Sequence, residues 1–138
     1  MKQFYSCIDV TLITPQPEQH ELSRRKAAKE GGHVVFYGAE EYRVHQLQPF
    51  ILNKLSRTNG IDGVIFFSID QFCYGERFNL RLLLDILHSK VGVHFAREDI
   101  SYVTVDEVMQ NFIVLSAYFH AFRRRRIIDA EEILRVLA

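Results

Sequence analysis

The sequence has few cysteines, no long apolar run and no visible export signal. Its two cysteines, Cys7 and Cys73, are too few for a disulfide framework, and both lie in apolar runs where a buried free thiol is expected. No segment approaches the roughly 20 apolar residues that cross a bilayer, and the N-terminus lacks the apolar core of a signal peptide. We therefore expect a cytoplasmic protein that is not associated with a membrane.

An excess of either charge is also missing, because the chain has 17 Lys plus Arg and 17 Asp plus Glu. Such a chain has no overall positive field to attract a polyanion such as DNA. The exception is an uninterrupted basic run of four residues, Arg123, Arg124, Arg125 and Arg126. These arginines either contact nucleic acid or close a helix, where cations interact favourably with the negative end of the helix dipole. Nucleic acid is thus an alternative partner that the overall charge does not favour.

Motifs for metals and for phosphate groups are absent as well. The six histidines are scattered, and neither a Cys-x-x-Cys nor a His-Glu-x-x-His spacing occurs. The stretch from Thr11 to Pro15, which follows the first predicted strand, has no glycine that would let backbone N–H groups approach a phosphate. We therefore predict no metal and no cofactor, and a nucleotide-binding loop is disfavoured.

What the sequence does have is an alternation of short apolar runs with helical segments. Strands are predicted at residues 4–10, 34–37, 63–67 and 91–95. Helices are predicted between them, at residues 18–29, 50–55 and 78–89. The run at 63–67 is apolar throughout, which is typical of a central parallel strand covered on both faces. The pattern predicts one α/β domain spanning residues 1–138, with a doubly wound, mostly parallel sheet of four to five strands.

The last third of the chain predicts a long helix at about 105–125 and a short terminal helix at about 129–137. Behind a Thr104–Glu107 capping box, apolar residues recur with heptad spacing at Val108, Phe112, Leu115, Phe119 and Phe122. Two heptads do not distinguish a helix packed in the core from a helix in a subunit interface. Both alternatives stay open, and a homodimer through this helix is one prediction.

Candidate functional residues lie in the loops after the predicted strands, because open α/β sheets bind ligands outside the carboxyl ends of their strands. Asp70 follows the most apolar strand, and Asp70 and Glu98 are candidate general acids or bases. Candidate ligand contacts are Glu40, Glu41, Ser68, Gln71 and Arg97. This acid-rich set suits a hydroxyl-bearing or cationic ligand better than a phosphate. The alternative is that the acids are solvated loop residues, or, for Asp70, a turn acid that bonds local N–H groups.

Several segments resemble the catalytic domain of the serine recombinases, the resolvase/invertase family, namely residues 19–32, 47–55, 62–72 and 82–95 and the long helix that ends near Arg123. The resemblance implies a resolvase-like fold with a long C-terminal helix. In that family a serine after the first strand attacks a DNA phosphate, and arginines stabilise the charge that develops in the transition state.

Most residues that the family uses for this reaction are replaced here. The family's strand-end Arg-Val-Ser falls near Leu12-Ile13-Thr14, so that the nucleophile would at best be Thr14. Of its Asp-Arg-x-x-Arg segment only Asp70 remains, because Gln71 and Tyr74 stand where the arginines are expected. Each such group commonly contributes on the order of a hundredfold in rate. The resemblance therefore implies a catalytically degenerate site.

Shorter stretches resemble the sporadic carbohydrate cluster family of bacteria, namely residues 41–42, 61–64, 67–68 and 94–98. This resemblance implies a role in surface-polysaccharide biosynthesis without an established reaction. Three functions are therefore open. The favoured one is a degenerate resolvase-fold protein acting as a binding or regulatory module. The others are an enzyme acting on a sugar or nucleotide-sugar at the strand carboxyl edge, and a DNA strand-exchange recombinase that uses Thr14.

Overall fold

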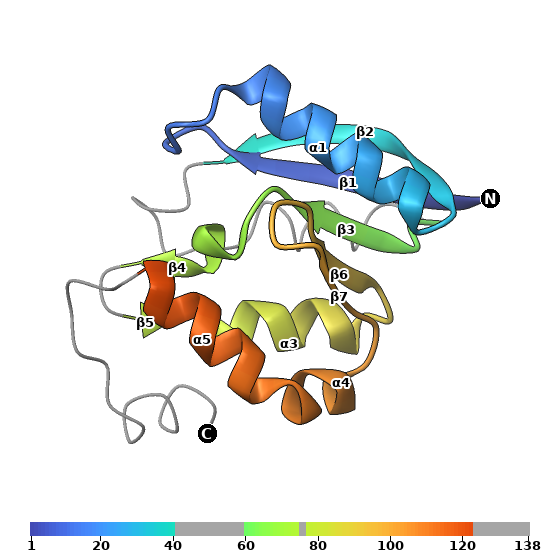
Figure 1. Cartoon of the computed structure of the whole chain (residues 1–138). Coiled ribbons are helices and arrows are strands. Elements are labelled where there is room, and N and C mark those ends of the chain that lie inside the picture. The colour runs from blue at the N-terminus through green and yellow to red at the C-terminus, as the bar shows by residue number, and fades with distance from the viewer. Residues whose placement is uncertain (41–59, 75–76, 123–138) are drawn as a thin grey trace.

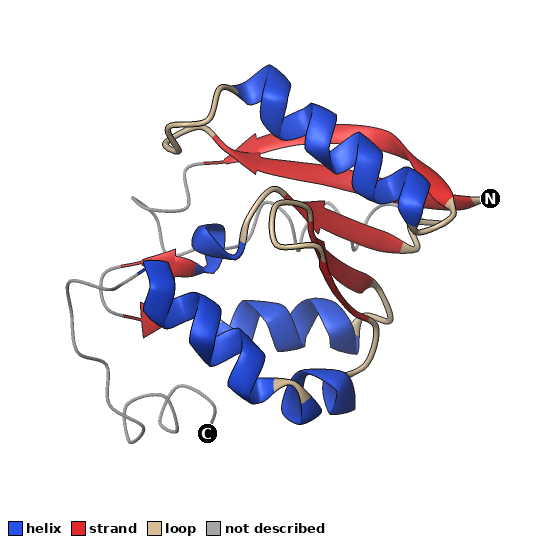
Figure 2. Cartoon of the chain, viewed as in Figure 1, coloured by secondary structure: helices blue, strands red, loops and turns tan. Residues whose placement is uncertain are grey.

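The computed structural model describes residues 1–40, 60–74 and 77–122, which form a five-stranded sheet with helices on both faces (Figures 1 and 2). Its strands are β1 (Lys2–Asp9), β2 (Gly32–Glu40), β3 (Gly63–Phe66), β6 (Gly92–Phe95) and β7 (Ile100–Tyr102). They lie in the order β2-β1-β3-β6-β7, and all are parallel except β7, which runs antiparallel to β6. The predicted α/β fold with a mostly parallel sheet is confirmed.

The helices divide between the two faces of the sheet (Figure 1). Helix α1 (Gln16–Lys29) covers one face, and α3 (Leu80–His88), α4 (Val105–Gln110) and α5 (Phe112–Phe122) lie on the other. A short 3-10 helix, η1 (Ile69–Phe72), follows β3. It leads into a small antiparallel pair formed by β4 (Cys73–Tyr74) and β5 (Arg77–Phe78). Figure 2 shows this connection between the sheet and α3.

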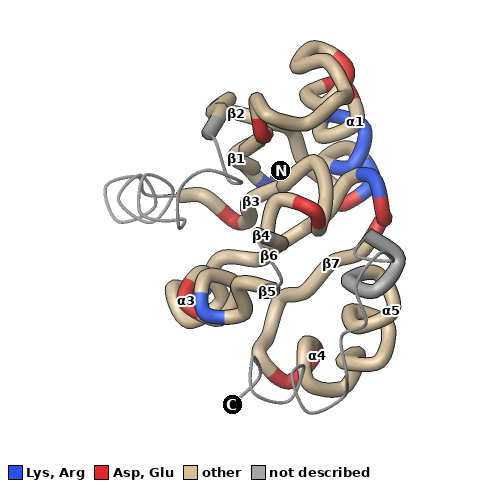
Figure 3. The backbone as a smooth tube through the Cα atoms, turned by 90° about the vertical axis from the view of Figure 1, so that its left-hand side faces the viewer, with Lys and Arg blue, Asp and Glu red and all other residues tan. Residues whose placement is uncertain are grey.

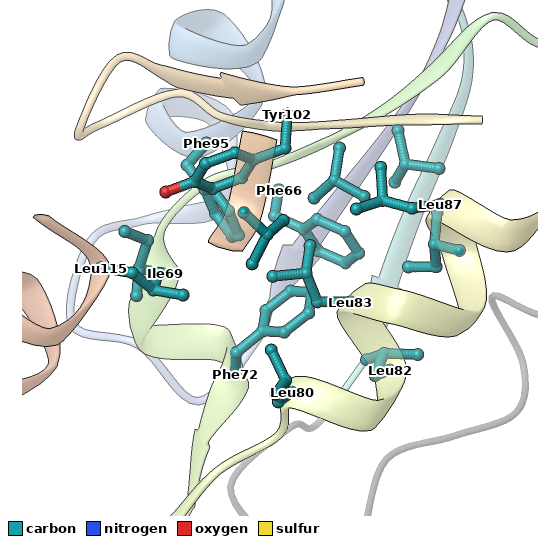
Figure 4. Packing of buried hydrophobic residues seen from close by; sticks show 14 of the residues in the cluster. Phe66, Ile69, Phe72, Leu80, Leu82, Leu83, Leu87, Phe95, Tyr102 and Leu115 are labelled. Atoms are coloured by element: carbon teal, nitrogen blue, oxygen red, sulfur yellow. The ribbon is translucent and has the colours of Figure 1, made fainter. Parts of the chain in front are cut away.

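The core lies mainly between the sheet and the α3–α5 face (Figure 4). Phe66 meets Phe72 edge to face with 4.7 Å between the ring centroids, and Phe72 meets Phe95 in the same way at 5.3 Å. Leu83 and Tyr102 are also fully buried there. The burial of these large side chains is the dominant favourable term in folding. It explains why β3 is apolar over its whole length.

Helix α1 packs on its face of the sheet largely through polar side chains. Its buried residues are Gln19, Ser23, Lys26 and Ala27. His20 Nδ1 lies 2.9 Å from the hydroxyl of Ser6 on β1. Because this helix has no broad apolar face, hydrogen bonds and ion pairs contribute more to its attachment than they do for α3.

The predicted long helix is divided at Asn111 into α4 and α5, so a continuous helix over residues 105–125 is not confirmed. The Asn111 side-chain amide donates to the carbonyl of Glu107 at 2.8 Å, and Asn111 closes α4 with φ −105° and ψ 21°. A short polar side chain that bonds to the backbone competes with regular helix formation. Two further predictions lie outside the described residues, namely the terminal helix at 129–137 and the basic run from Arg123 to Arg126.

The heptad positions that the structure describes face the core. Val108 and Leu115 are buried in the main cluster, and Phe112 is half-buried. The large exposed side chains of α4 and α5 are instead Met109, Ile113 and Val114. The side chains of Phe119 and Phe122 lie outside the described part of the chain. Within the described residues, no helix has the length and apolar character needed to span a membrane.

Candidate functional site

The strand order places a topological switch point between β1 and β3. The chain leaves β1 through α1 to β2 on one side, and β3 then lies on the other side of β1. Loops that leave such neighbouring strands diverge, and open α/β sheets bind ligands in the crevice at the carboxyl ends of those strands. Asp9 ends β1, and Ser68 follows β3 by two residues. These two positions therefore mark the candidate site.

Ser68 and Gln71 form a capping box at the start of η1. The Ser68 hydroxyl accepts from the Asp70 N–H at 3.0 Å, and the Gln71 side chain accepts from the Ser68 N–H at 3.1 Å. The Gln71 amide also donates to the carbonyl of Cys7 on β1 at 3.1 Å. Gln71 is fully buried. It therefore joins η1 to the end of β1, across the switch point.

A second set of bonds ties this turn to the loop between β6 and β7. The Ser68 hydroxyl donates to Glu98 Oε2 at 2.8 Å, and the Ile69 N–H donates to Glu98 Oε1 at 3.0 Å. Arg97 donates to Glu98 Oε2 at 3.1 Å and to Ser68 Oγ at 2.6 Å. The guanidinium carbon of Arg97 also lies 5.4 Å from the centroid of the Phe67 ring. The Glu98 side chain is only 2% exposed. We call Ser68, Gln71, Arg97 and Glu98 the edge lock.

The structure thus brings together four of the predicted site residues, and they bond mainly to one another. The single proton of the Ser68 hydroxyl is directed to Glu98, and its lone pairs accept from Arg97 and from the Asp70 N–H. Asp70 itself is half-exposed in the first turn of η1, where a negative charge suits the helix N-terminus. The side chain of Glu40, at the end of β2, and all of Glu41 lie outside the described residues.

None of the sequence patterns singled out Asp9, which the structure places at the switch point. Its N–H donates to Gln19 Oε1 at 3.2 Å, and its carbonyl accepts from Gln19 Nε2 at 3.0 Å. Its Oδ1 accepts from the N–H of Thr11 at 2.8 Å and from the Thr11 hydroxyl at 2.6 Å. The signal that could have identified it is an aspartate that directly follows the apolar pair Cys7 and Ile8 at the end of a strand.

Thr14 lies five residues beyond the end of β1, in the loop before α1. It is half-buried, and its carbonyl accepts from Gln19 Nε2 at 2.7 Å. Leu12, Ile13 and Thr14 therefore belong to the β1–α1 loop, whereas the strand itself ends at Asp9.

A network of charged residues joins α1 to the β6–β7 turn on the face covered by α1 (Figure 3). Lys26 is nearly buried, and its Nζ lies 2.9 Å from Glu30 Oε1 and 2.8 Å from Asp99 Oδ1. Lys29 pairs with the other oxygen of Asp99. Hydrogen bonds from Lys26 and Lys29 lower the pKa of Asp99 to about 2. These ion pairs hold Asp99 in the left-handed conformation at φ 55°, which is unfavourable for most residues.

His94 extends this network into the sheet. Its Nδ1 lies 2.8 Å from Ser101 Oγ, and the Ser101 hydroxyl donates to Glu30 Oε1 at 2.8 Å. Because that donation uses the hydroxyl proton, His94 Nδ1 must be the donor to Ser101. The ring fits because Gly63 and Gly92 have no Cβ, which would lie 2.9 and 3.1 Å from His94 Nε2. Burial lowers the pKa of His94 to about 4, so the imidazole is neutral at pH 7.

The described residues contain no group of three or more His, Cys, Asp or Glu side chains placed to hold a metal ion. No family model matches the chain, and no curated protein matches it. Among solved structures, the crystal structure of the N-terminal catalytic domain of TP901-1 integrase is similar, with a TM-score of 0.60 and 16% sequence identity. The match covers 91% of this chain and 100% of that one.

The chain has a resolvase-like fold. This bears out the fold that the sequence segments predicted, apart from the break at Asn111. At 16% identity the likeness concerns the fold alone, and a shared fold does not imply a shared reaction. The chemistry of the resolvase-like domain must therefore be argued from its own residues at the switch point.

Proposed function

We propose that this resolvase-like chain is a binding or regulatory module that neither cuts nor joins DNA. Attack on a phosphate needs a hydroxyl that can reach the phosphorus, together with cations that neutralise the developing charge. The observation that carries the proposal is the edge lock, in which the Ser68 hydroxyl is fully buried and bonded to Glu98 and Arg97. At the two arginine positions of the recombinase Asp-Arg-x-x-Arg segment this chain has Gln71 and Tyr74, which carry no positive charge.

A role in surface-polysaccharide biosynthesis is the biological setting that we propose for this module. It is supported by the short stretches that resemble the sporadic carbohydrate cluster family. Two of these stretches, residues 67–68 and 94–98, contain three of the four residues of the edge lock as well as His94. The two oxygens of Glu98 accept from three donors, which favours a binding module over an enzyme that uses Glu98 as acid or base.

The proposal is tested by incubating the purified chain with a DNA substrate that traps a covalent protein–DNA intermediate. We expect neither nicking nor an adduct, and the Thr14→Ala variant should behave as the wild type does. An active serine recombinase on its own site serves as the positive control. An adduct that forms with the wild type and is lost in Thr14→Ala would establish a recombinase and reject the proposal.

A homodimer through α4 and α5 is the second part of the proposal. The sequence of α5 has no Lys, Arg, Asp or Glu, and Ile113 and Val114 are 82% and 44% exposed. With Met109 they form an apolar surface of the kind that marks protein interfaces. A twofold symmetric pair of identical surfaces is the most common arrangement among soluble oligomers.

Sedimentation velocity at micromolar concentrations tests this dimer. The wild type should sediment as a dimer, and Ile113→Asp should weaken association by about tenfold or more, because a charge would be buried against its own symmetry mate. Since Ile113 is exposed in the single chain, the thermal unfolding of the monomer should change little. A wild type that remains monomeric at these concentrations contradicts the proposed interface.

A further inference from the structure

The carboxylate of Asp9 is satisfied on only one of its two oxygens. Oδ1 accepts two bonds from Thr11, whereas Oδ2 is buried and has no hydrogen-bond partner. The residue as a whole is 0% exposed. Gln19 does not supply the missing donor, because its amide N–H groups are directed to the carbonyls of Asp9 and Thr14.

This arrangement is costly for the folded chain. Buried charges in proteins are almost always paired or coordinated, and an unpaired buried carboxylate loses its hydration without compensation. Across the described residues, no Lys, Arg or His forms an ion pair with Asp9. A buried polar atom without a partner requires an explanation, and one explanation is that it awaits a ligand.

The position of Asp9 favours that explanation. It ends β1 at the topological switch point, where open α/β sheets bind their ligands. The loop that follows presents apolar side chains to solvent, with Val10 38% and Ile13 98% exposed. A charged acceptor beside aliphatic side chains matches a ligand that carries a cationic donor on an aliphatic stem.

We propose that the switch point binds an organic cation, whose ammonium or guanidinium group donates to Asp9 Oδ2. A neutral hydroxyl would satisfy the hydrogen bond and leave the buried negative charge uncompensated. The absence of a three-residue metal cluster among the described residues disfavours a metal ion. The inference rests on the proposed function, since it names the class of ligand that the binding module takes at the same edge.

Titration of the full-length chain with 1,4-diaminobutane, followed by the shifts of backbone amide resonances, tests the inference. The amide signals of Asp9 and Thr11 should move and saturate with the diamine. They should not saturate with the matched diol, 1,4-butanediol, over the same concentration range. In Asp9→Asn the affinity should fall by about tenfold or more, because a hydrogen bond to a charged group is lost.

The same variant separates a ligand contact from a structural role. The asparagine Oδ1 still accepts from Thr11, and the substitution removes a buried charge without a partner. Asp9→Asn should therefore unfold at the same temperature as the wild type or a few degrees higher.

Four results would overturn the inference: no saturable shift with the diamine, equal binding of the diol, equal diamine binding by Asp9→Asn, or saturation of the same amides by Mg²⁺ alone. A marked fall in the unfolding temperature of Asp9→Asn would also overturn it, since Oδ2 would then be satisfied within the chain. The DNA assay is independent of these results. A chain that binds no diamine and forms no DNA adduct refutes this inference and leaves the proposed function standing.

Discussion

Replacing Glu98 with alanine should lower the free energy of unfolding by about 2 to 4 kcal/mol. The carboxylate accepts from the Ser68 hydroxyl, the Ile69 N–H and Arg97, and its side chain is only 2% exposed. Its removal leaves the Ser68 and Ile69 donors buried without an acceptor. Arg97 loses less, because its side chain is 37% exposed and water can take the place of the carboxylate. Urea unfolding at pH 7 measures the change.

Two further variants show whether burial causes this effect. Glu98→Gln keeps an acceptor for the buried donors and should cost only about 1 kcal/mol. Glu107→Ala removes a carboxylate that accepts from the N–H and the hydroxyl of Thr104 in more exposed bonds, and it should also cost about 1 kcal/mol or less. If Glu98→Ala were as mild as Glu107→Ala, the edge lock would not hold the two loops together.

The sheet could be predicted because its central strands are buried on both faces. The run at 63–67 is apolar throughout, and the structure places β3 between β1 and β6 with all four of its residues buried. Strand β7 was not predicted, because three residues are too short for a periodic signal. The break at Asn111 was missed for a related reason. The apolar spacing of Val108, Phe112 and Leu115 continues across it, and only a local side-chain bond marks it.

The location of the candidate site could be predicted, and its internal bonding could not. Ser68, Gln71, Arg97 and Glu98 were expected at one edge because each follows a predicted strand, and the structure brings them together there. The sequence does not tell how deeply a loop acid is buried. Glu98 is almost inaccessible, whereas its neighbour Asp99 is exposed and points to α1. Asp9 was missed because it lies inside the predicted strand at residues 4–10, whereas candidate residues were sought in the loops after the strands.

Acidification should destabilise the fold through His94. Burial, opposed in part by Glu30 and reinforced by Lys26 and Lys2, lowers the pKa of this imidazole from 6.5 to about 4. Between these values the unfolded chain binds a proton that the folded chain does not bind, so falling pH favours the unfolded state. The linked loss of stability is about 3 kcal/mol by pH 4, of which about 2 kcal/mol is lost by pH 5. Asp99 contributes in a lower pH range. Because its pKa is lowered, the stability that it adds is fully present above its ordinary pKa of 3.8 and is lost only as the pH falls below that value.

Urea unfolding at several values between about pH 7.5 and about pH 5 measures the His94 contribution. The free energy of unfolding of the wild type should fall across this range. Most of that fall should vanish in His94→Phe, because the phenyl ring can occupy the space over Gly63 and Gly92 but cannot titrate.

His20 should add to the fall in the same direction, since burial and Arg24 lower its pKa. The variant His20→Gln measures the contribution of His20 alone. A wild-type stability that stays constant down to pH 5 would mean that the folded state accepts the proton. The added proton would then lie on Nε2, beside Gly63 and Gly92, because Nδ1 already donates to Ser101.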